Sequence, residues 1–159
     1  MKEHIVIYLI YLLFTLPAQA IAGREATFPR FPALSPDGKT VAFCYGGDIW
    51  TVPSSGGRAE RLTSSEAYEH TLSWSPDGGW IAFTADRQGN DDVYIMPSDG
   101  GQSRQLTFHE SDDRVCDWTA DGNMVIFSSR RDDRYADRRM LYRVSRDGGT
   151  PEPVMDAYG

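Results

Sequence analysis

The sequence predicts an all-β protein, built as a partial β-propeller with about three four-stranded blades. Three observations favour this class. Three stretches of the chain share the same landmarks in the same order, their turn aspartates are spaced by 40 and then 44 residues, and apolar residues alternate between the turns. A period in the forties is typical of one four-stranded blade. No segment after the first 22 residues has a helical period over eleven or more residues.

The landmarks of each repeat follow one order. The first repeat contains S-P-D-G at 35–38, V-A-F at 41–43, D-I-W at 48–50, G-G at 56–57 and L-T at 62–63. The second contains S-P-D-G at 75–78, I-A-F at 81–83, D-V-Y at 92–94, G-G at 100–101 and L-T at 106–107. The third is looser, with T-A-D-G at 119–122, V-I-F at 125–127, L-Y at 141–142 and G-G at 148–149.

Each landmark predicts one element of the blade. In S-P-D-G the proline presets φ, the aspartate bonds the backbone ahead of it and the glycine takes a conformation that a side chain disfavours, so a hairpin turn joins the first two strands. Val41 and Phe43 face one side of the second strand and Ala42 faces the other. Apolar residues on both faces indicate a sheet packed between neighbouring sheets. A third strand follows through the tryptophan or tyrosine, and the paired glycines allow a tight turn into a fourth strand that ends at Leu-Thr.

One loop grows along the chain. The interval from the second strand to the third is 7 residues from Phe43 to Trp50, 11 in the second repeat and 15 in the third. Since the repeats otherwise agree, the added residues lie in one loop on the same rim of every blade. Insertions confined to one face mark the face on which a repeat protein binds its ligand.

The first 22 residues are expected to be a signal peptide. Lys2 and His4 precede an apolar run from 5 to 16, followed by Pro17 and small-residue sites that allow cleavage after Ala20 or Ala22. The alternative is an uncleaved anchor, which the shortness of the run disfavours. We therefore expect an exported protein, periplasmic or extracellular, with no membrane span in the mature chain. Residues 23–159 form the partial propeller, with blade repeats at about 28–63, 68–107 and 112–154.

Charge and cysteine usage narrow the function. The net charge is −7 and stays there after leader removal, which argues against nucleic-acid partners because phosphate backbones bind clustered positive charge. Two cysteines in an exported protein can pair. Cys44 and Cys116 occupy non-equivalent repeat positions, however, so we expect two separate, small buried residues.

Catalytic and metal sites are not predicted within this chain. His70 and His109 both follow a Leu-Thr landmark and neither has a G-x-S-x-G elbow, so we interpret them as exposed loop histidines. The acidic segment 86–92 lacks the ligand spacing of an EF-hand loop, and a polar hairpin loop is favoured over calcium binding. No cofactor is expected.

The third-blade loop is rich in arginine. Arg130 and Arg131 could hold a peptide carboxylate by paired hydrogen bonds, and they are the candidate peptide-binding residues. The alternative is a solvated loop in which Asp132, Asp133 and Asp137 neutralise the arginines. The aromatic residues at fixed repeat positions are assigned to packing between blades rather than to ligand stacking: Trp50, Trp74, Tyr94, Trp118 and Tyr142.

The motif set S-P-D-G-x-x-[VI]-A-F, D-[IV]-[WY], G-G and L-T resembles the Tol-system and tricorn group of propeller repeats. Within that group the start F-P-A-L-S-P-D-G at 31–38 and the segments 47–53 and 83–97 are most similar to the N-terminal propeller of tricorn-type serine peptidases. The resemblance implies six repeats in that propeller, then a second propeller, a PDZ-like domain and a distant catalytic domain. Three repeats are present here, so we expect a fragment, or a ring completed by other chains.

The resemblance implies a propeller that admits or filters oligopeptides toward an active site in a missing C-terminal domain. The expected partners are peptides or a protein, the remaining blades and domains of the parent protein, and copies of the full-length protein. An alternative is a periplasmic Tol-like propeller that binds other proteins. A propeller fused to an α/β-hydrolase peptidase is a third possibility, which a downstream G-x-S-x-G would reveal.

Overall fold

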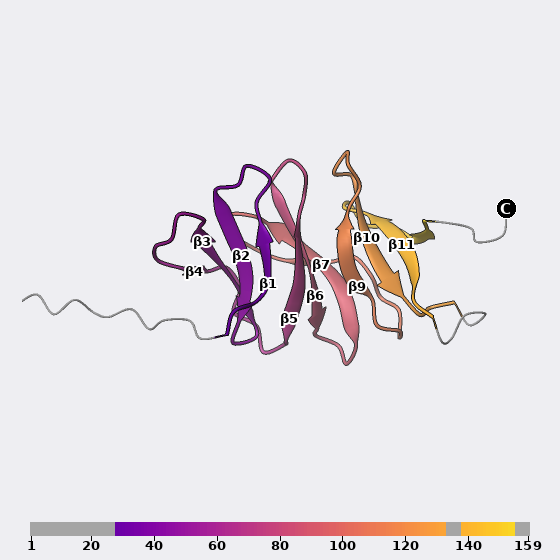
Figure 1. The fold of residues 1–159 in the computed structure, drawn as a ribbon. Helices are drawn as coiled ribbons and strands as arrows, with labels where there is room; N and C mark the ends of the chain where they lie inside the picture. The colour runs from indigo at the N-terminus through magenta and orange to yellow at the C-terminus, as the bar shows by residue number, and fades with distance from the viewer. Residues whose placement is uncertain (1–27, 133–137, 155–159) are drawn as a thin grey trace, which may run out of the picture.

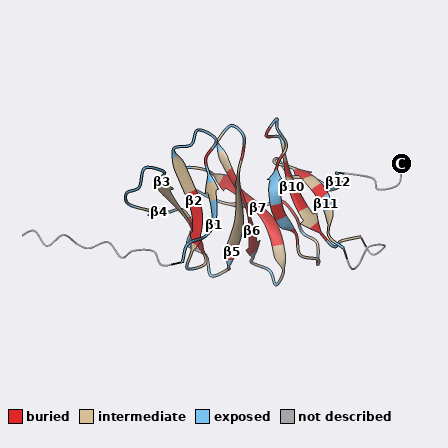
Figure 2. Ribbon diagram, viewed as in Figure 1, coloured by how far each residue is buried: buried red, intermediate tan, exposed pale blue. Residues whose placement is uncertain are grey.

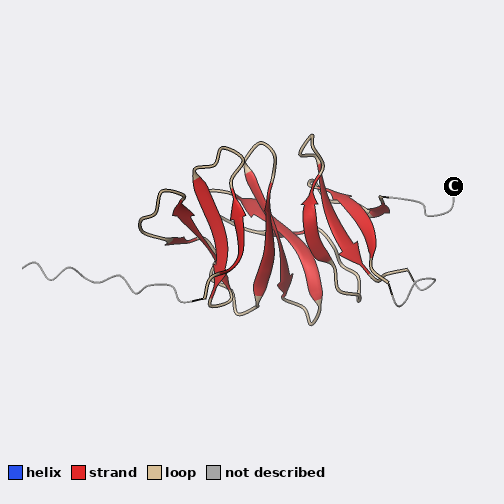
Figure 3. Cartoon of the chain, in the orientation of Figure 1, coloured by secondary structure: helices blue, strands red, loops and turns tan. Residues whose placement is uncertain are grey.

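Three antiparallel sheets of four strands each stand side by side in chain order, with each sheet forming one blade (Figure 1). The computed structural model describes residues 28–132 and 138–154, so the expected signal peptide and two of the aspartates expected to neutralise the arginine-rich loop, Asp133 and Asp137, lie outside the described residues. Figure 3 shows strands and connecting loops without a helix in the described part of the chain. The predicted all-β class and the four-strand blade are therefore confirmed. No helix within 28–132 or 138–154 is long and apolar enough to cross a membrane.

Within each blade the four strands follow one another in chain order from the centre of the arc to its outer edge. Blade 1 contains β1 (Arg30–Leu34), β2 (Thr40–Tyr45), β3 (Asp48–Pro53) and β4 (Glu60–Arg61). Blade 2 contains β5 (Glu69–Trp74), β6 (Trp80–Asp86), β7 (Asp91–Pro97) and β8 (Arg104–Gln105). Blade 3 contains β9 (Arg114–Trp118), β10 (Met124–Ser129), β11 (Met140–Ser145) and β12 (Glu152–Pro153). The first strands β1, β5 and β9 lie next to one another, so they are the innermost strands of the arc.

The S-P-D-G segments form the predicted turns. Asp37 Oδ1 accepts hydrogen bonds from the Ser35 hydroxyl (2.6 Å) and from the backbone N–H of Lys39 (3.0 Å). Gly38 has φ +73°, a conformation that glycine adopts without steric cost. The same bonds recur around Asp77 and around Asp121, where Thr119 replaces the serine. The loosened third motif thus keeps the turn because a hydroxyl remains at its first position.

The apolar core lies in the two seams between blades, where burial is highest (Figure 2). In the first seam Ala42 and Ile49 of blade 1 pack with Phe83 and Tyr94 of blade 2. The second seam joins the opposite face of blade 2 to blade 3, and its buried members are Ala82, Val93, Ile95, Leu106, Val115, Trp118, Val125, Phe127, Tyr142 and Val144. Blade 2 is therefore apolar on both faces, as its sequence pattern predicted.

The fixed aromatic residues pack largely as predicted. Tyr94, Trp118 and Tyr142 are buried in the seams, and Trp74 is packed against the first. The indole N–H of Trp74 donates to the carbonyl of Ala33 (3.0 Å), and that of Trp118 donates to the carbonyl of Ser73 (3.1 Å), so each tryptophan ties its blade to the preceding one. Trp50 differs from them. It lies opposite Phe43 in the ladder, and both side chains are on the face of blade 1 that points away from blade 2.

Candidate functional site

The growing loops gather at one end of the arc. Because strands alternate in direction, the loops after β2, β6 and β10 share one rim with the connections between blades, and the S-P-D-G and G-G turns lie at the other (Figure 1). We call the first end the loop rim: it includes 46–47, 87–90, the described parts of 130–139, and the connections 62–68 and 106–113. The predicted confinement of the added residues to one loop position is therefore confirmed.

One arginine from the loop rim enters each seam. Arg87 pairs with the fully buried Glu69 at 2.6 Å, and Arg131 pairs with the fully buried Asp113 at 2.5 Å. Each guanidinium also lies over aromatic rings of its own blade, Arg87 at 4.5 Å from the centroid of Tyr94 and Arg131 at 5.0 Å from that of Phe127. A planar guanidinium suits both contacts. The pairs close the loop-rim end of the two seams.

The two candidate peptide-binding arginines thus have different surroundings. Arg131 is largely buried, with its side chain 13% exposed and its guanidinium on Asp113, whereas Arg130 is exposed on the loop rim. A peptide carboxylate at Arg131 would have to share the guanidinium with Asp113. Arg130 can meet a ligand directly, and Arg131 anchors the loop from which it projects.

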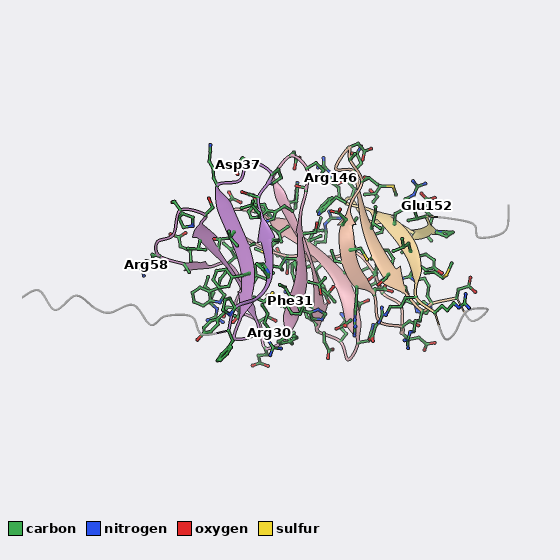
Figure 4. All side chains as sticks on the ribbon, in the orientation of Figure 1. Arg30, Phe31, Asp37, Arg58, Arg146 and Glu152 are labelled. Atoms are coloured by element: carbon green, nitrogen blue, oxygen red, sulfur yellow. The ribbon has the colours of Figure 1, made fainter. Side chains whose placement is uncertain are left out.

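Basic residues occupy one equivalent position at the start of each innermost strand. Arg30, His70 and Arg114 lie opposite Cys44, Thr84 and Ser128 in their respective ladders, which are matching positions of the three blades. Figure 4 shows Arg30 and Phe31 at the lower end of β1, which is the loop rim. The position brings a positive or protonatable group from every blade to the mouth of the arc.

Asp91 joins two of these basic residues. Its Oδ1 lies 3.1 Å from His70 Nε2 and its Oδ2 lies 2.9 Å from Arg114 Nε. His70 Nδ1 lies 2.8 Å from the hydroxyl of its neighbour Thr71. Asp112 adds contacts of 3.8 Å to Arg114 and 3.6 Å to Arg139. Asp91 therefore acts as a polar clamp between blades 2 and 3.

This clamp corrects the sequence-based interpretation of the histidines. His70 is a strand residue with a side chain only 12% exposed, because β5 begins one residue before it and its ring is held by Thr71 and Asp91. His109 does lie in a connection between blades, yet it is half-buried, and its Nδ1 accepts a hydrogen bond from the backbone of Ser111 (3.0 Å).

Strained backbone marks the same end of the innermost strands. Phe31 and Thr71 both have positive φ, 52° and 54°, and lie where the ladders of β1 and β5 shift register. Positive φ is uncommon in residues other than glycine and clusters at functional positions. The ring centroid of Phe31 lies 5.6 Å from that of His70. The ring centroid of Tyr68 lies 5.5 Å from that of His70.

A pocket of about 400 Å³ opens on the loop rim of blade 1. Its lining includes Phe28, Arg30, Tyr45, Glu66 and Tyr68, of which Phe28 is 85% exposed and Tyr68 is 47% exposed. Exposed aromatic rings beside charged groups are typical of surfaces that bind peptides or proteins. The pocket is thus suited to an extended chain with an apolar side group.

The cysteines are both free, but they are not both buried. Cys44 lies at the base of the pocket, where burial raises the pKa of its thiol to about 12, and it therefore stays protonated and a poor nucleophile. The prediction of a buried Cys116 is wrong. This residue is exposed because the irregular ladder of β9 turns it out of the seam.

The acidic segment 86–92 forms a hairpin loop between β6 and β7, in which Asp86 Oδ1 accepts a hydrogen bond from the N–H of Gly89 (2.9 Å). Asp92 is buried, and the charges of Asp113 and Arg131 in blade 3 act on it. Among the residues that the structure describes, no three His, Cys, Asp or Glu side chains come together in a way that could hold a metal ion.

Comparisons with known proteins agree with this architecture. Residues 26–159 match the family of the tricorn protease N-terminal beta propeller domain. The tricorn protease homolog 1 of Streptomyces coelicolor is 40% identical over 60 residues, which are 38% of this chain and 5% of that protein. The chain therefore spans only a small part of this curated relative.

Two solved structures have the same fold. A putative TolB from Agrobacterium tumefaciens is 29% identical with a TM-score of 0.71, covering 83% of this chain and 48% of that one. The tricorn protease has a TM-score of 0.71 at 21% identity, covering 82% of this chain and 13% of that one. With the repeats, the blade order and the family match over 26–159 in agreement, the chain belongs to the tricorn protease N-terminal β-propeller family.

Proposed function

We propose that this chain is the N-terminal propeller part of an exported tricorn-like serine peptidase, and that it admits or filters oligopeptides on their way to an active site in another domain. The family membership supports the first part of this proposal. The single observation that carries the second is the gathering of basic and exposed aromatic side chains on the loop rim, where each innermost strand begins.

The loop rim offers two kinds of contact to a peptide. Arg30 and Arg130 are exposed and have no ion-pair partner among the described residues, so their guanidinium groups can take a terminal carboxylate in paired hydrogen bonds. Phe31 and Tyr68 flank the first seam with exposed rings, which suit apolar side chains of a passing peptide. Arg131 contributes by holding the loop of Arg130 against the second seam.

Peptide binding is tested with two oligopeptides that differ only at the C-terminus, one a free carboxylate and the other an amide. We expect the free acid to bind more tightly in fluorescence anisotropy, and Arg130→Ala and Arg30→Ala each to weaken it by about tenfold, since a hydrogen bond to a charged group contributes about 1.5 kcal/mol. The matched control is Arg58→Ala, an exposed arginine in the turn after β3 at the opposite end of its blade (Figure 4). Equal loss in Arg58→Ala, or equal affinity for acid and amide, would contradict the proposal.

Export has its own test. Expression of the full chain in a bacterium, followed by mass spectrometry of the exported protein, is expected to show a new N-terminus after Ala20 or Ala22. Retention of Met1 on an exported or membrane-bound product would contradict cleavage.

A second candidate function is protein binding of the Tol kind, which the similarity to the TolB structure favours. The reading frame beyond Gly159 distinguishes the two. A PDZ-like segment and a serine-peptidase region would support the peptide filter, whereas further blades followed by a stop codon would support the binding module.

A further inference from the structure

The two seams contain the same polar network with one difference in charge. At the loop-rim end of the first seam Asp48 accepts from Arg61 at 2.6 Å beside the connection to blade 2, and Glu69 inside the seam accepts from Arg87 at 2.6 Å. The network thus sets two carboxylates against two guanidinium groups. Both carboxylate oxygens of Glu69 have a hydrogen-bond donor: Arg87 donates to Oε1, and the Thr63 hydroxyl donates to Oε2.

The second seam repeats this network at equivalent positions. Asp92, Thr107, Asp113 and Arg131 correspond to Asp48, Thr63, Glu69 and Arg87. Gln105 stands where the first seam has Arg61, and it makes the same two contacts: its amide donates to Asp92 Oδ2 (3.0 Å) and to the carbonyl of Thr107 (2.8 Å). The neutral amide leaves two buried carboxylates facing one guanidinium.

The remaining hydrogen bonds do not make up for the missing charge. The Thr107 hydroxyl donates to Asp92 Oδ1 at 3.1 Å rather than to Asp113. Asp113 is fully buried, Asp92 is 2% exposed, and Asp113 Oδ1 has no hydrogen-bond partner among the described residues. A buried carboxylate with an unused oxygen and a second carboxylate beside it is costly to keep ionised.

We propose that the second seam is a proton-binding site, in which Asp92, with the buried Asp113 beside it, holds a proton that is released as the solution becomes neutral. The proton supplies the positive charge that Arg61 supplies in the first seam. The charged and titratable groups that face the pair are Arg131, the phenol of Tyr94 and the two carboxylates themselves, while Gln105 and Thr107 contribute neutral hydrogen bonds.

The electrostatics agree with this geometry. The pKa of Asp92 is raised to about 6: burial is the largest cause and the Asp113 charge adds to it, while the Thr107 hydrogen bond, Arg131 and the Gln105 hydrogen bond oppose the rise. A carboxyl whose pKa is raised in the folded protein binds a proton that the unfolded chain has already lost. Stability is therefore highest below the unfolded pKa and falls as the pH rises from about 4 to about 6.

The test compares the full chain with variants in which the residue that differs between the two networks, Gln105 or Arg61, is replaced by its counterpart. Urea midpoints are measured from pH about 4 to about 8, and the Asp92 carboxyl carbon is titrated by NMR. In the parent chain we expect the midpoint to fall between pH about 4 and about 6, and Asp92 to titrate near pH 6. Gln105→Arg, which gives the second seam the charge balance of the first, is expected to lower the Asp92 pKa toward about 4 and to flatten the fall.

Two further variants keep the proposal falsifiable if the arginine does not fit. Asp92→Asn mimics the protonated acid and is expected to remove the pH dependence while keeping the high midpoint at neutral pH. Arg61→Gln is expected to create a second pH-dependent step in the first seam. Titration of Asp92 near 4 in the parent chain would overturn the proposal. A rise in the urea midpoint of the parent chain at neutral pH on adding calcium or potassium ions would also overturn it, because it would assign the seam to a metal cation.

Discussion

At the scale of single residues, the seam arginines stand out because they combine an ion pair with ring stacking. Arg131 contacts Asp113 at 2.5 Å and lies over the rings of Phe127 and Tyr142. Removing one partner of a buried pair is costly because the other charge stays behind without compensation. Neighbouring Arg130 is exposed and takes no part in the buried pair.

Arg131→Met is therefore expected to lower the free energy of unfolding by about 3–5 kcal/mol, since it strands the Asp113 carboxylate in the second seam. Arg130→Met, one position away, is expected to change it by no more than about 0.5 kcal/mol. Urea denaturation followed by tryptophan fluorescence measures both. Similar losses in the two variants would argue against the assigned role of the buried pair.

A second prediction at this scale concerns the turn aspartates. The Thr119 hydroxyl first, and then the N–H of Asn123, lower the pKa of Asp121 to about 2. A lowered pKa means that the stabilising contribution of the carboxylate is present above its unfolded value of 3.8 and is lost as the pH falls through about 2. NMR titration of Thr119→Val should show the Asp121 pKa moving up toward 3.8, with Asp37 as the unchanged reference. An unmoved Asp121 would show that the hydroxyl bond is not the main cause.

At the scale of elements, the turn rather than the strand carries the repeat. The β1–β2, β5–β6 and β9–β10 turns keep the same hydrogen bonds although the third has lost both serine and proline. The strands between them tolerate many apolar residues, because any pair of the right volume fills a seam. A turn that needs positive φ at one position tolerates far fewer.

Gly38→Ala tests this directly. A Cβ at Gly38 would meet nothing within 4 Å, so the only cost is the left-handed backbone at φ +73°. We expect a loss of about 1–2 kcal/mol in the free energy of unfolding. Gly38→Asn should lose less, since asparagine adopts this conformation more readily. Equal stability of the alanine variant and the parent chain would mean that the turn can rearrange.

At the scale of the whole molecule, each blade buries one face against the next, so the outermost faces of the three-blade arc have no neighbour within the described chain. Blade 1 presents the half-buried Val41 and Trp50 on its outer face, and blade 3 presents Leu141, which is 43% exposed. In the seams the equivalent positions are covered by the adjacent blade.

The 159-residue chain alone is therefore expected to self-associate, because apolar blade faces need covering. Light scattering after size-exclusion chromatography should give a mass that rises with concentration, and Leu141→Lys should reduce that rise. Ser73→Lys, on an innermost strand, is the control for added charge. A strictly monomeric parent chain over the accessible concentration range would contradict this prediction.

The sequence by itself determined the blade period, the strand order within each blade and the turn chemistry, because all three depend on residues close together in the chain. It also placed the growing loops on one rim, since strand direction alternates. What only the tertiary structure decided were the contacts between blades. Burial of His70 beside Asp91 and pairing of Arg131 with Asp113 join residues 21 and 18 positions apart in the chain, and Cys116 is exposed where the ladder of β9 shifts register. Such contacts depend on how the strands and blades pack together, which no local pattern encodes.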